Sequence, residues 1–271
     1  MGQPRTNVSR ASLALFFFIS ALCSVVRAHA ADSPDRVERK RALLGKLVAS
    51  YPDFLASHDG NALRWKAGTT MSFDDGKGEK DFETRLDHPD LEDEFYAPYP
   101  AGRAGIPPAV DIDPGRVRYE PFFAKMYGDC KKGEVTKKLV EVTWLPKHGG
   151  TKLKVTAVNG VAEKLTAVSA ALDALPDSFV KYLTPTGGIY NCRTIAGTTR
   201  PSVHGNGIAI DINVAWSDYW RNAKPVGGKY VYKNRIPWEI VEIFEKHGFI
   251  WGGKWYHYDT MHFEYRPELL P

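Results

Sequence analysis

The stretch Ser202-Val-His204-Gly-Asn-Gly207-Ile-Ala-Ile-Asp211-Ile-Asn213 carries the strongest pattern in the chain. Its three isoleucines alternate with Ala209, Asp211 and Asn213, which is the period of a β-strand. A strand with this pattern buries the isoleucines and presents Asp211 on its opposite face. His204 precedes the strand on a glycine-containing turn, which allows its imidazole to fold back over that face. A histidine and a carboxylate that converge in this way suit a zinc ion.

A second motif, Asp259-Thr-Met-His262, offers the remaining groups of a zinc site. His262 completes a His-Asp-His set and leaves the fourth tetrahedral position for water, as catalytic zinc sites do. Asp259 is expected beside that water as the general base, and zinc lowers the pKa of the water to about 7. Spacing alone also allows a structural role for these residues, and Asp259 a role in capping a turn.

An arginine near these motifs is the candidate for binding the anionic part of a substrate. Arg193 lies eleven residues before His204, and its guanidinium can bind a carboxylate or stabilise a developing oxyanion. A surface ion pair is the alternative role for Arg193.

The patterns around the motifs predict short strands and a few helices. Residues 139–145 and 153–158 flank Gly149-Gly150 as a hairpin, and residues 188–195, 208–213, 249–251 and 261–265 are strand-like. Residues 162–175 and the segment between Pro237 and Gly248 are typical of helices. Strands and helices do not alternate regularly. The fold class is therefore α+β, with a small, largely antiparallel sheet, flanking helices and the zinc site.

The N-terminal part is expected to form an extension. Residues 35–50 predict an amphipathic helix, and residues 61–73 a hairpin. Repeated proline and glycine over residues 99–115 indicate a boundary. We therefore expect an extension of unknown role over 31–110 and a catalytic domain over 111–271.

Residues 1–30 have the organisation of a signal peptide. Arg5 and Arg10 precede an apolar run over residues 12–26, and Ala28-His-Ala30 supplies small residues for cleavage before Ala31. The run is short for a membrane span, although an uncleaved anchor is the alternative. The expected location is therefore periplasmic or extracellular, with no stable membrane span after cleavage.

Cleavage would leave two cysteines, Cys130 and Cys192. An even pair in an oxidising compartment predicts a disulfide, and two buried free thiols are the alternative.

The composition excludes several classes of protein. The chain is 43% hydrophobic and 25% charged over 271 residues, which is typical of a globular protein. The net charge is only +4, and three unbalanced arginines lie within residues 1–30. The rest of the chain is nearly neutral, so nucleic acid is not an expected partner. The sequence makes no prediction of the oligomeric state.

The motifs resemble those of the zinc D-alanyl-D-alanine peptidases. The resemblance rests on Ser202-x-His204-x-x-Gly207-x-Ala-x-Asp211, Gly248-Phe-x-Trp251-Gly-Gly-x-Trp255 and Asp259-x-x-His262-Phe, within residues 186–268. This family includes VanY-type carboxypeptidases, VanX-type dipeptidases and L-alanyl-D-glutamate endopeptidases. The resemblance implies that His204, Asp211 and His262 bind one zinc ion and that the substrates are peptidoglycan peptides.

The chain departs from this family at two places. The vancomycin-resistance members have Glu where this chain has Asp259, whereas the endopeptidase branch has Asp. The family arginine lies farther upstream than Arg193, and Arg200 is the second candidate for its role. The segment before about residue 110 matches no known part of the family.

Three further residues are expected near the site. Ser202 hydrogen-bonds close to the ligands or is a plain turn serine. Trp251 and Trp255 wall the substrate groove or pack in the core.

The predicted function is zinc-dependent hydrolysis of an amide bond in peptidoglycan stem peptides, with a D-alanyl-D-alanine carboxypeptidase as the first choice. The alternatives are an L-alanyl-D-glutamate-type endopeptidase, another zinc peptidase, and a non-catalytic, zinc-stabilised cell-wall binding module.

Overall fold

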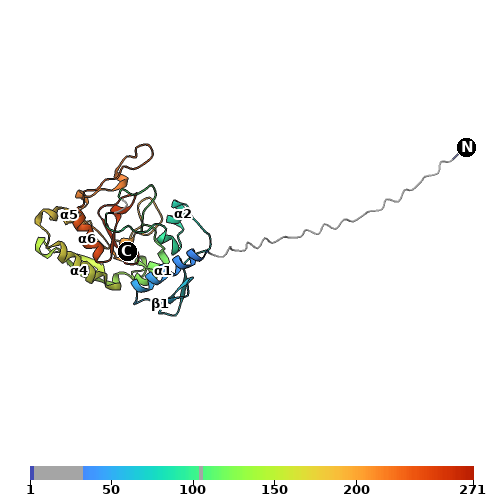
Figure 1. Cartoon of the computed structure of the whole chain (residues 1–271), viewed down its shortest axis with the longest axis horizontal. Helices are drawn as coiled ribbons and strands as arrows, with labels where there is room; N and C mark the ends of the chain where they lie inside the picture. The colour runs from blue at the N-terminus through green and yellow to red at the C-terminus, as the bar shows by residue number, and fades with distance from the viewer. Residues whose placement is uncertain (3–32, 104–105) are drawn as a thin grey trace. The chain divides into compact units, whose positions relative to one another are not determined.

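The computed structural model describes residues 1–2, 33–103 and 106–271. Residues 34–271 form one compact unit (Figure 1). The expected signal peptide falls almost wholly outside the described residues. No helix among the described residues has the length and apolarity needed to cross a membrane.

The N-terminal part of this unit combines one long helix with a small sheet. Helix α1 (Pro34–Ser50) packs Leu44 and Leu47 into the core. Strands β1 (Leu55–His58), β2 (Ala62–Trp65) and β3 (Thr70–Ser72) form an antiparallel sheet in that order. The predicted helix and hairpin are confirmed. Helix α2 (Phe82–Asp87) and a 3-10 turn, η1 (Glu92–Phe95), follow.

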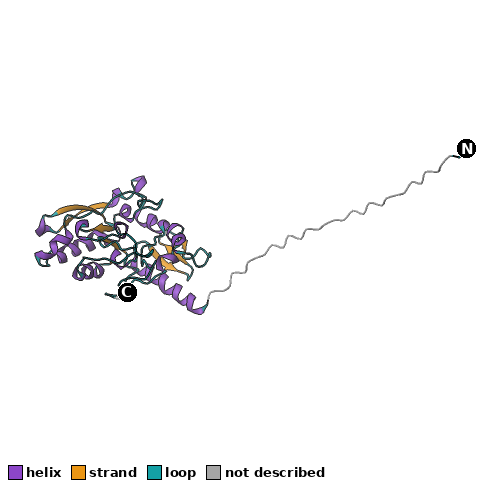
Figure 2. Cartoon of the chain, turned by 90° about the horizontal axis from the view of Figure 1, so that it is seen from above, coloured by secondary structure: helices purple, strands orange, loops and turns teal. Residues whose placement is uncertain are grey.

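The C-terminal part contains two more sheets, and Figure 2 shows the strands in separate groups. Helix α3 (Glu120–Tyr127) precedes the antiparallel pair β4 (Leu139–Trp144) and β5 (Thr151–Thr156). Helix α4 (Val161–Leu172) packs on β4 and β5, the short helix α5 (Val180–Leu183) follows it, and α6 (Trp238–Lys246) packs on the last sheet through β7. That sheet has the order β6 (Ala209–Asp211), β8 (His262–Tyr265), β7 (Phe249–Trp251) and is antiparallel throughout. The predicted α+β class is confirmed.

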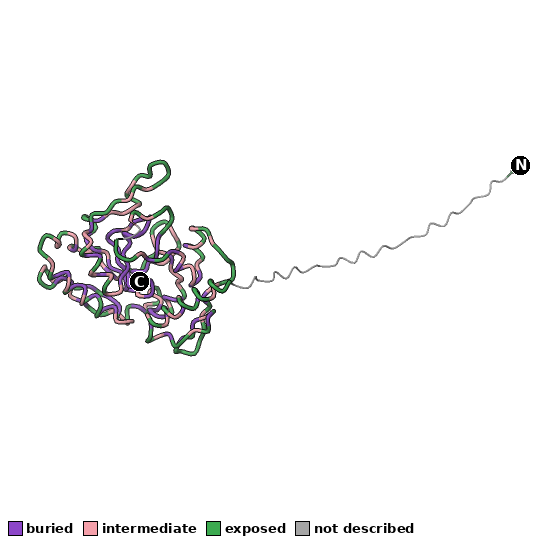
Figure 3. The backbone as a smooth tube through the Cα atoms, in the orientation of Figure 1, coloured by how far each residue is buried: buried purple, intermediate pink, exposed green. Residues whose placement is uncertain are grey.

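The core behind this last sheet is aromatic. Phe263 of β8 stacks on Phe244 of α6 with 3.8 Å between ring centroids. Ile208, Ile210 and Ile212 are each at most 1% exposed, as their alternation predicts. Figure 3 shows buried residues at the centre of the unit and exposed loops around them. The apolar face of the sheet is thus held by packing, and its other face is left to polar groups.

Helix α6 ends where the sequence predicts. Gly248 follows the helix with φ of 94°, and a Cβ there would lie 2.7 Å from the ring of Tyr265. The backbone can turn into β7 only because the residue is glycine.

The strand expected over residues 188–195 is wrong. The segment makes only two isolated bridges, Gly188 with Asp211 and Thr194 with Pro201. Gly188 has a positive φ of 104°, which interrupts an extended ladder, and most of the following residues are exposed. The segment is therefore a loop that lies along the end of β6.

The predicted disulfide joins this loop to the turn after α3. Cys130 and Cys192 are bonded, with their Cα atoms 5.7 Å apart. Gly205 lies against the bridge, because a Cβ there would be 3.0 Å from Cys130 Sγ. The bridge therefore supports the turn that carries His204.

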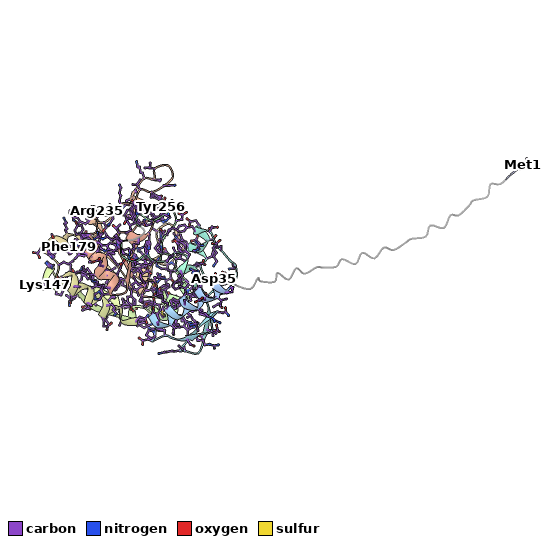
Figure 4. The ribbon with its side chains drawn as sticks, viewed as in Figure 1. Met1, Asp35, Lys147, Phe179, Arg235 and Tyr256 are labelled. Carbon is purple, nitrogen blue, oxygen red and sulfur yellow. A yellow bond between two sulfur atoms is a disulfide. The ribbon has the colours of Figure 1, made fainter. Side chains whose placement is uncertain are left out.

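Buried polar groups connect the N-terminal and C-terminal parts. Tyr51 donates a hydrogen bond to Glu268 at 2.5 Å, and Arg266 pairs with Glu94 at 2.6 Å. In Figure 4, Asp35 marks the start of α1, and Lys147 and Phe179 lie on the opposite side of the unit. The domain boundary near residue 110 stays a prediction.

Candidate metal centre

The pairing of two strands brings Asp211 and His262 together. Asp211 of β6 is the register partner of His262 of β8, and directly opposed side chains on one face of a sheet come into contact. Asp211 Oδ1 lies 3.0 Å from His262 Nδ1. Two motifs that are fifty-one residues apart thus meet through an antiparallel ladder.

His204 reaches the same point from the turn η7 (Val203–Asn206). Its Nε2 lies 3.3 Å from both Asp211 Oδ1 and His262 Nδ1. Gly207 ends this turn with φ of 70°, and a Cβ there would be 2.9 Å from Leu139. The glycine lets the backbone turn sharply at this point and enter β6. His204, Asp211 and His262 together form a group that can hold a metal ion.

Hydrogen bonds to the outer ring nitrogens orient both imidazoles. His204 Nδ1 lies 2.6 Å from the carbonyl oxygen of Ile189, to which it must donate. His262 Nε2 lies 3.5 Å from the buried carboxylate of Glu264. Protons on these two atoms leave His204 Nε2 and His262 Nδ1 with lone pairs directed at the cluster.

The cluster has strongly shifted pKa values. Burial would raise the pKa of Asp211, but hydrogen bonds with His204 and His262 hold it well below its usual range. Burial opposes the charge on His262, yet hydrogen bonds to Asp211 and Glu264 raise its pKa to about 9. The site therefore keeps an anionic carboxylate between the two histidines, and His262 must give up its Nδ1 proton when a cation binds, because only the neutral imidazole is a metal ligand.

Asp259 is half-buried next to this cluster, and its Oδ1 atom is fully buried. Burial raises its pKa to about 6, while His262 lowers the pKa and Asp211 raises it further. Its Oδ1 has no hydrogen-bond partner among the described residues. The backbone of Asp259 is held close to Gly252, where a Cβ would meet its carbonyl oxygen at 2.6 Å. A carboxylate in this state is suited to accept a proton.

A cavity of about 440 Å³ opens onto these four residues. Of the other predicted residues, Arg193, Ser202 and Trp255 also line it. Trp255 has its ring 5.6 Å from that of His262, whereas Trp251 is fully buried and bonded to Thr260. Trp251 is thus a core residue. Arg200 lies outside this cavity and pairs with Asp87 at 3.0 Å.

Two arginines that line the cavity were not predicted from the sequence. Arg116 lines the cavity and is fixed by the fully buried Asp113, at 2.7 Å. Arg118 lines it too and makes three hydrogen bonds to Glu264, which in turn contacts His262. No local pattern marks Arg118, because Arg118 and Glu264 are separated by 146 positions.

A second acidic group, Asp74, Asp75 and Asp90, also satisfies the distances for a cation. Lys80 lies 3.1 Å from Asp90 and 3.2 Å from Asp75. Arg36 and Lys40 pair with Asp74, so cationic side chains already occupy all three carboxylates and the group is an ion-pair network.

Comparison with known proteins agrees with the motifs. A family model described as D-alanyl-D-alanine carboxypeptidase matches residues 196–265, which confirms the predicted resemblance. The matched segment contains His204, Asp211, Asp259 and His262 and supports a peptidase. No curated protein and no solved structure matches the chain.

Proposed function

We propose that the protein is a zinc peptidase that hydrolyses an amide bond in peptidoglycan stem peptides, with D-alanyl-D-alanine carboxypeptidase as its activity. One observation carries the proposal. Three donor atoms of His204, Asp211 and His262 lie within 3.3 Å of one another, next to the unpartnered carboxylate oxygen of Asp259.

The donor set fits zinc. Tetrahedral zinc with bonds of about 2.0–2.1 Å places its ligand atoms roughly 3.3 Å apart, and the donor atoms here are separated by 3.0 to 3.3 Å. Two imidazoles also favour zinc over magnesium or calcium. When bound, zinc would supply Lewis acidity and a water that is acidic near neutral pH.

Asp259 would act as the general base and then as the general acid. Its carboxylate lines the cavity, and its raised pKa matches the task of taking a proton from water and returning it to the leaving amine. The close approach of Gly252 holds the backbone of Asp259 in place.

Arginines would bind the anionic part of the substrate. Arg193 is exposed, and its guanidinium donates to the carbonyl oxygen of the next residue, Thr194. Arg116 is held by Asp113 and lies over the ring of Trp255 at 5.9 Å. A fixed guanidinium is the better preorganised group. We therefore assign Arg116 the main role and Arg193 a second contact at the rim.

Export fits this substrate, because peptidoglycan lies outside the cytoplasmic membrane. The predicted leader over residues 1–30 supports export, and the disulfide is consistent with an oxidising compartment.

An L-alanyl-D-glutamate-type endopeptidase is the second candidate, because that branch of the family has Asp at the position of Asp259. Another zinc peptidase would use the same residues on a different peptide. A non-catalytic binding module is a weaker alternative, since such a module has no need for a buried general base beside the ligands.

One experiment separates these alternatives. The protein is purified without its leader, its metal content is measured, and it is incubated with muropeptides that end in D-Ala-D-Ala while products are followed by mass. About one zinc per chain with loss of the terminal D-Ala, abolished by a chelator or by His262→Ala, is the expected result.

The other outcomes are equally informative. A cut within the stem would identify an endopeptidase, and cleavage only of unrelated peptides would identify another zinc peptidase. Zinc without cleavage would favour the binding module. Absence of metal would refute the site assignment.

A further inference from the structure

A second cavity adjoins the one at the metal centre. It has a volume of about 320 Å³. Arg116, Arg118 and Ile195 line both cavities, so the two are neighbours across a shared wall. A peptide that extends beyond the metal-centre cavity in this direction would therefore meet the second cavity.

The N-terminal segment builds one wall of this second cavity. The end of α2 and the turn after it contribute Leu86, Asp87, His88 and Pro89. This wall is firmly anchored, because Asp81 caps α2 through the amide of Thr84 at 2.8 Å and Leu86 is 8% exposed. The extension is thus in position to contact a substrate.

Three arginines line the cavity: Arg116, Arg118 and Arg200. Arg116 and Arg118 are held by fully buried acids, Asp113 and Glu264, which an incoming group cannot displace, and Arg116 is already assigned to the metal-centre cavity. Arg200 differs, because its partner Asp87 has a side chain that is 52% exposed. An ion pair with an exposed member contributes little to stability, so an incoming carboxylate can replace Asp87 at small cost.

The remaining lining suits an amino-acid side chain with a short apolar stem. Leu86, Pro89, Pro121, Ile195 and Pro201 supply apolar surface around the arginines. Glu120 is the one other acid in the lining besides Asp87. Burial and the charge of Asp129 raise its pKa to about 7, so it carries only part of a negative charge at neutral pH and opposes an anion weakly.

We propose that this cavity is a subsite for a carboxylate-bearing residue of the peptide substrate, with Arg200 as the residue that determines this specificity. The wall from α2 makes the N-terminal segment part of the substrate site. Asp87 forms an ion pair with Arg200 until a substrate carboxylate takes its place. The proposal rests on the proposed peptidase function for the identity of the ligand as a peptide.

The test uses pairs of peptides that differ by one isosteric change. Each peptide ends in D-Ala-D-Ala and carries glutamate or glutamine at one of the three positions before that pair. KM and kcat are measured for the wild-type protein, Arg200→Gln and Asp87→Asn. Arg64→Gln is the control, because Arg64 is exposed on β2 and its partner Asp59 is also exposed.

Opposite effects of the two variants are expected. At one position the wild-type protein should prefer glutamate over glutamine by about tenfold in KM, as expected for a charge-assisted hydrogen bond. Arg200→Gln should abolish that preference, whereas Asp87→Asn should strengthen it by freeing Arg200. Arg64→Gln should leave it unchanged. If Arg200 and Asp87 served only to stabilise the fold, both variants would lower thermal stability and leave the preference intact.

Direct binding separates this proposal from the proposed function. The same peptides are titrated calorimetrically into protein stripped of metal with a chelator, so that turnover plays no part. An Arg200-dependent preference for glutamate without any cleavage by the metal-loaded protein would retain the subsite and refute the peptidase. Cleavage with no glutamate preference at any position, or with a preference that survives Arg200→Gln, would overturn the subsite.

Discussion

Glu264 should control the affinity of the metal centre although it does not belong to the ligand set. It is fully buried, 3.5 Å from His262 Nε2, and is bonded to Arg118 and Arg266. Glu264→Gln keeps the shape of the side chain but removes its charge. His262 would then face at best a neutral amide oxygen in place of the carboxylate that fixes its tautomer and raises its basicity, and such changes weaken metal binding by about 10- to 100-fold.

The contacts of Glu264 also determine how much Glu264→Gln lowers the free energy of unfolding. Arg266 would retain Glu94 and Glu268, whereas Arg118 would lose its acidic partner. Breaking a buried ion pair costs roughly 3–5 kcal/mol. Because Arg118 is partly exposed and Arg266 stays paired, we expect a loss near the lower end, about 3 kcal/mol in the free energy of unfolding.

The matched control is Glu268→Gln. Glu268 is also fully buried and pairs with Arg266, but its hydrogen bonds go to Arg266 and Tyr51. This variant should lose stability to a similar extent and keep the zinc affinity of the wild-type protein. Zinc affinity is measured by competition with a chromophoric chelator, and stability by urea unfolding. Equal zinc affinities for Glu264→Gln and the wild-type protein, or equal weakening in both variants, would refute the reasoning.

Three further predictions follow from the site and its supports. Asp259→Asn should lower kcat by about 10²- to 10⁴-fold while the zinc content stays near one per chain; unchanged turnover would remove Asp259 from the mechanism. Replacing both Cys130 and Cys192 by serine should lower the free energy of unfolding by about 4 kcal/mol, since the bridge closes a long loop, and urea unfolding with and without reductant measures this. Burial alone would raise the pKa of Asp113, but its hydrogen bond with His257 and the charge of Arg116 lower it. The resulting stabilisation should be complete above the unfolded pKa of about 3.9 and lost as the pH falls through the folded pKa; unfolding curves of the wild-type protein and Asp113→Asn that converge below pH 3.9 would agree with this, whereas a constant difference would contradict it.

The grouping of His204, Asp211 and His262 could be predicted from the sequence because its signals are local. The alternation around Ile210 identifies the face of β6, and the spacing from His204 to Asp211 leaves one turn between them. The meeting with His262 needed only an antiparallel register that places two polar residues opposite each other.

Other parts of the site depend on tertiary contacts with no local trace. Trp251 and Trp255 belong to one motif, yet the first packs on Phe263 and the second faces His262. The role of Arg118 arises from a contact across 146 positions. The prediction of a strand over residues 188–195 was wrong for a related reason. The segment has a β-like composition, but tertiary contacts hold it as a loop, at two isolated bridges and at the disulfide of Cys192.

The pairing of Asp211 with His262 links occupancy of the site to the alignment of its strands. β6 has only three residues, and sliding it by one position along β8 would turn Asp211 to the opposite face. The donor atoms converge in one alignment alone, so an ion bound there stabilises that alignment by its own binding free energy. Amide hydrogens of β6 and β8 should therefore exchange more slowly in the loaded protein, which makes the sheet a reporter of metal uptake.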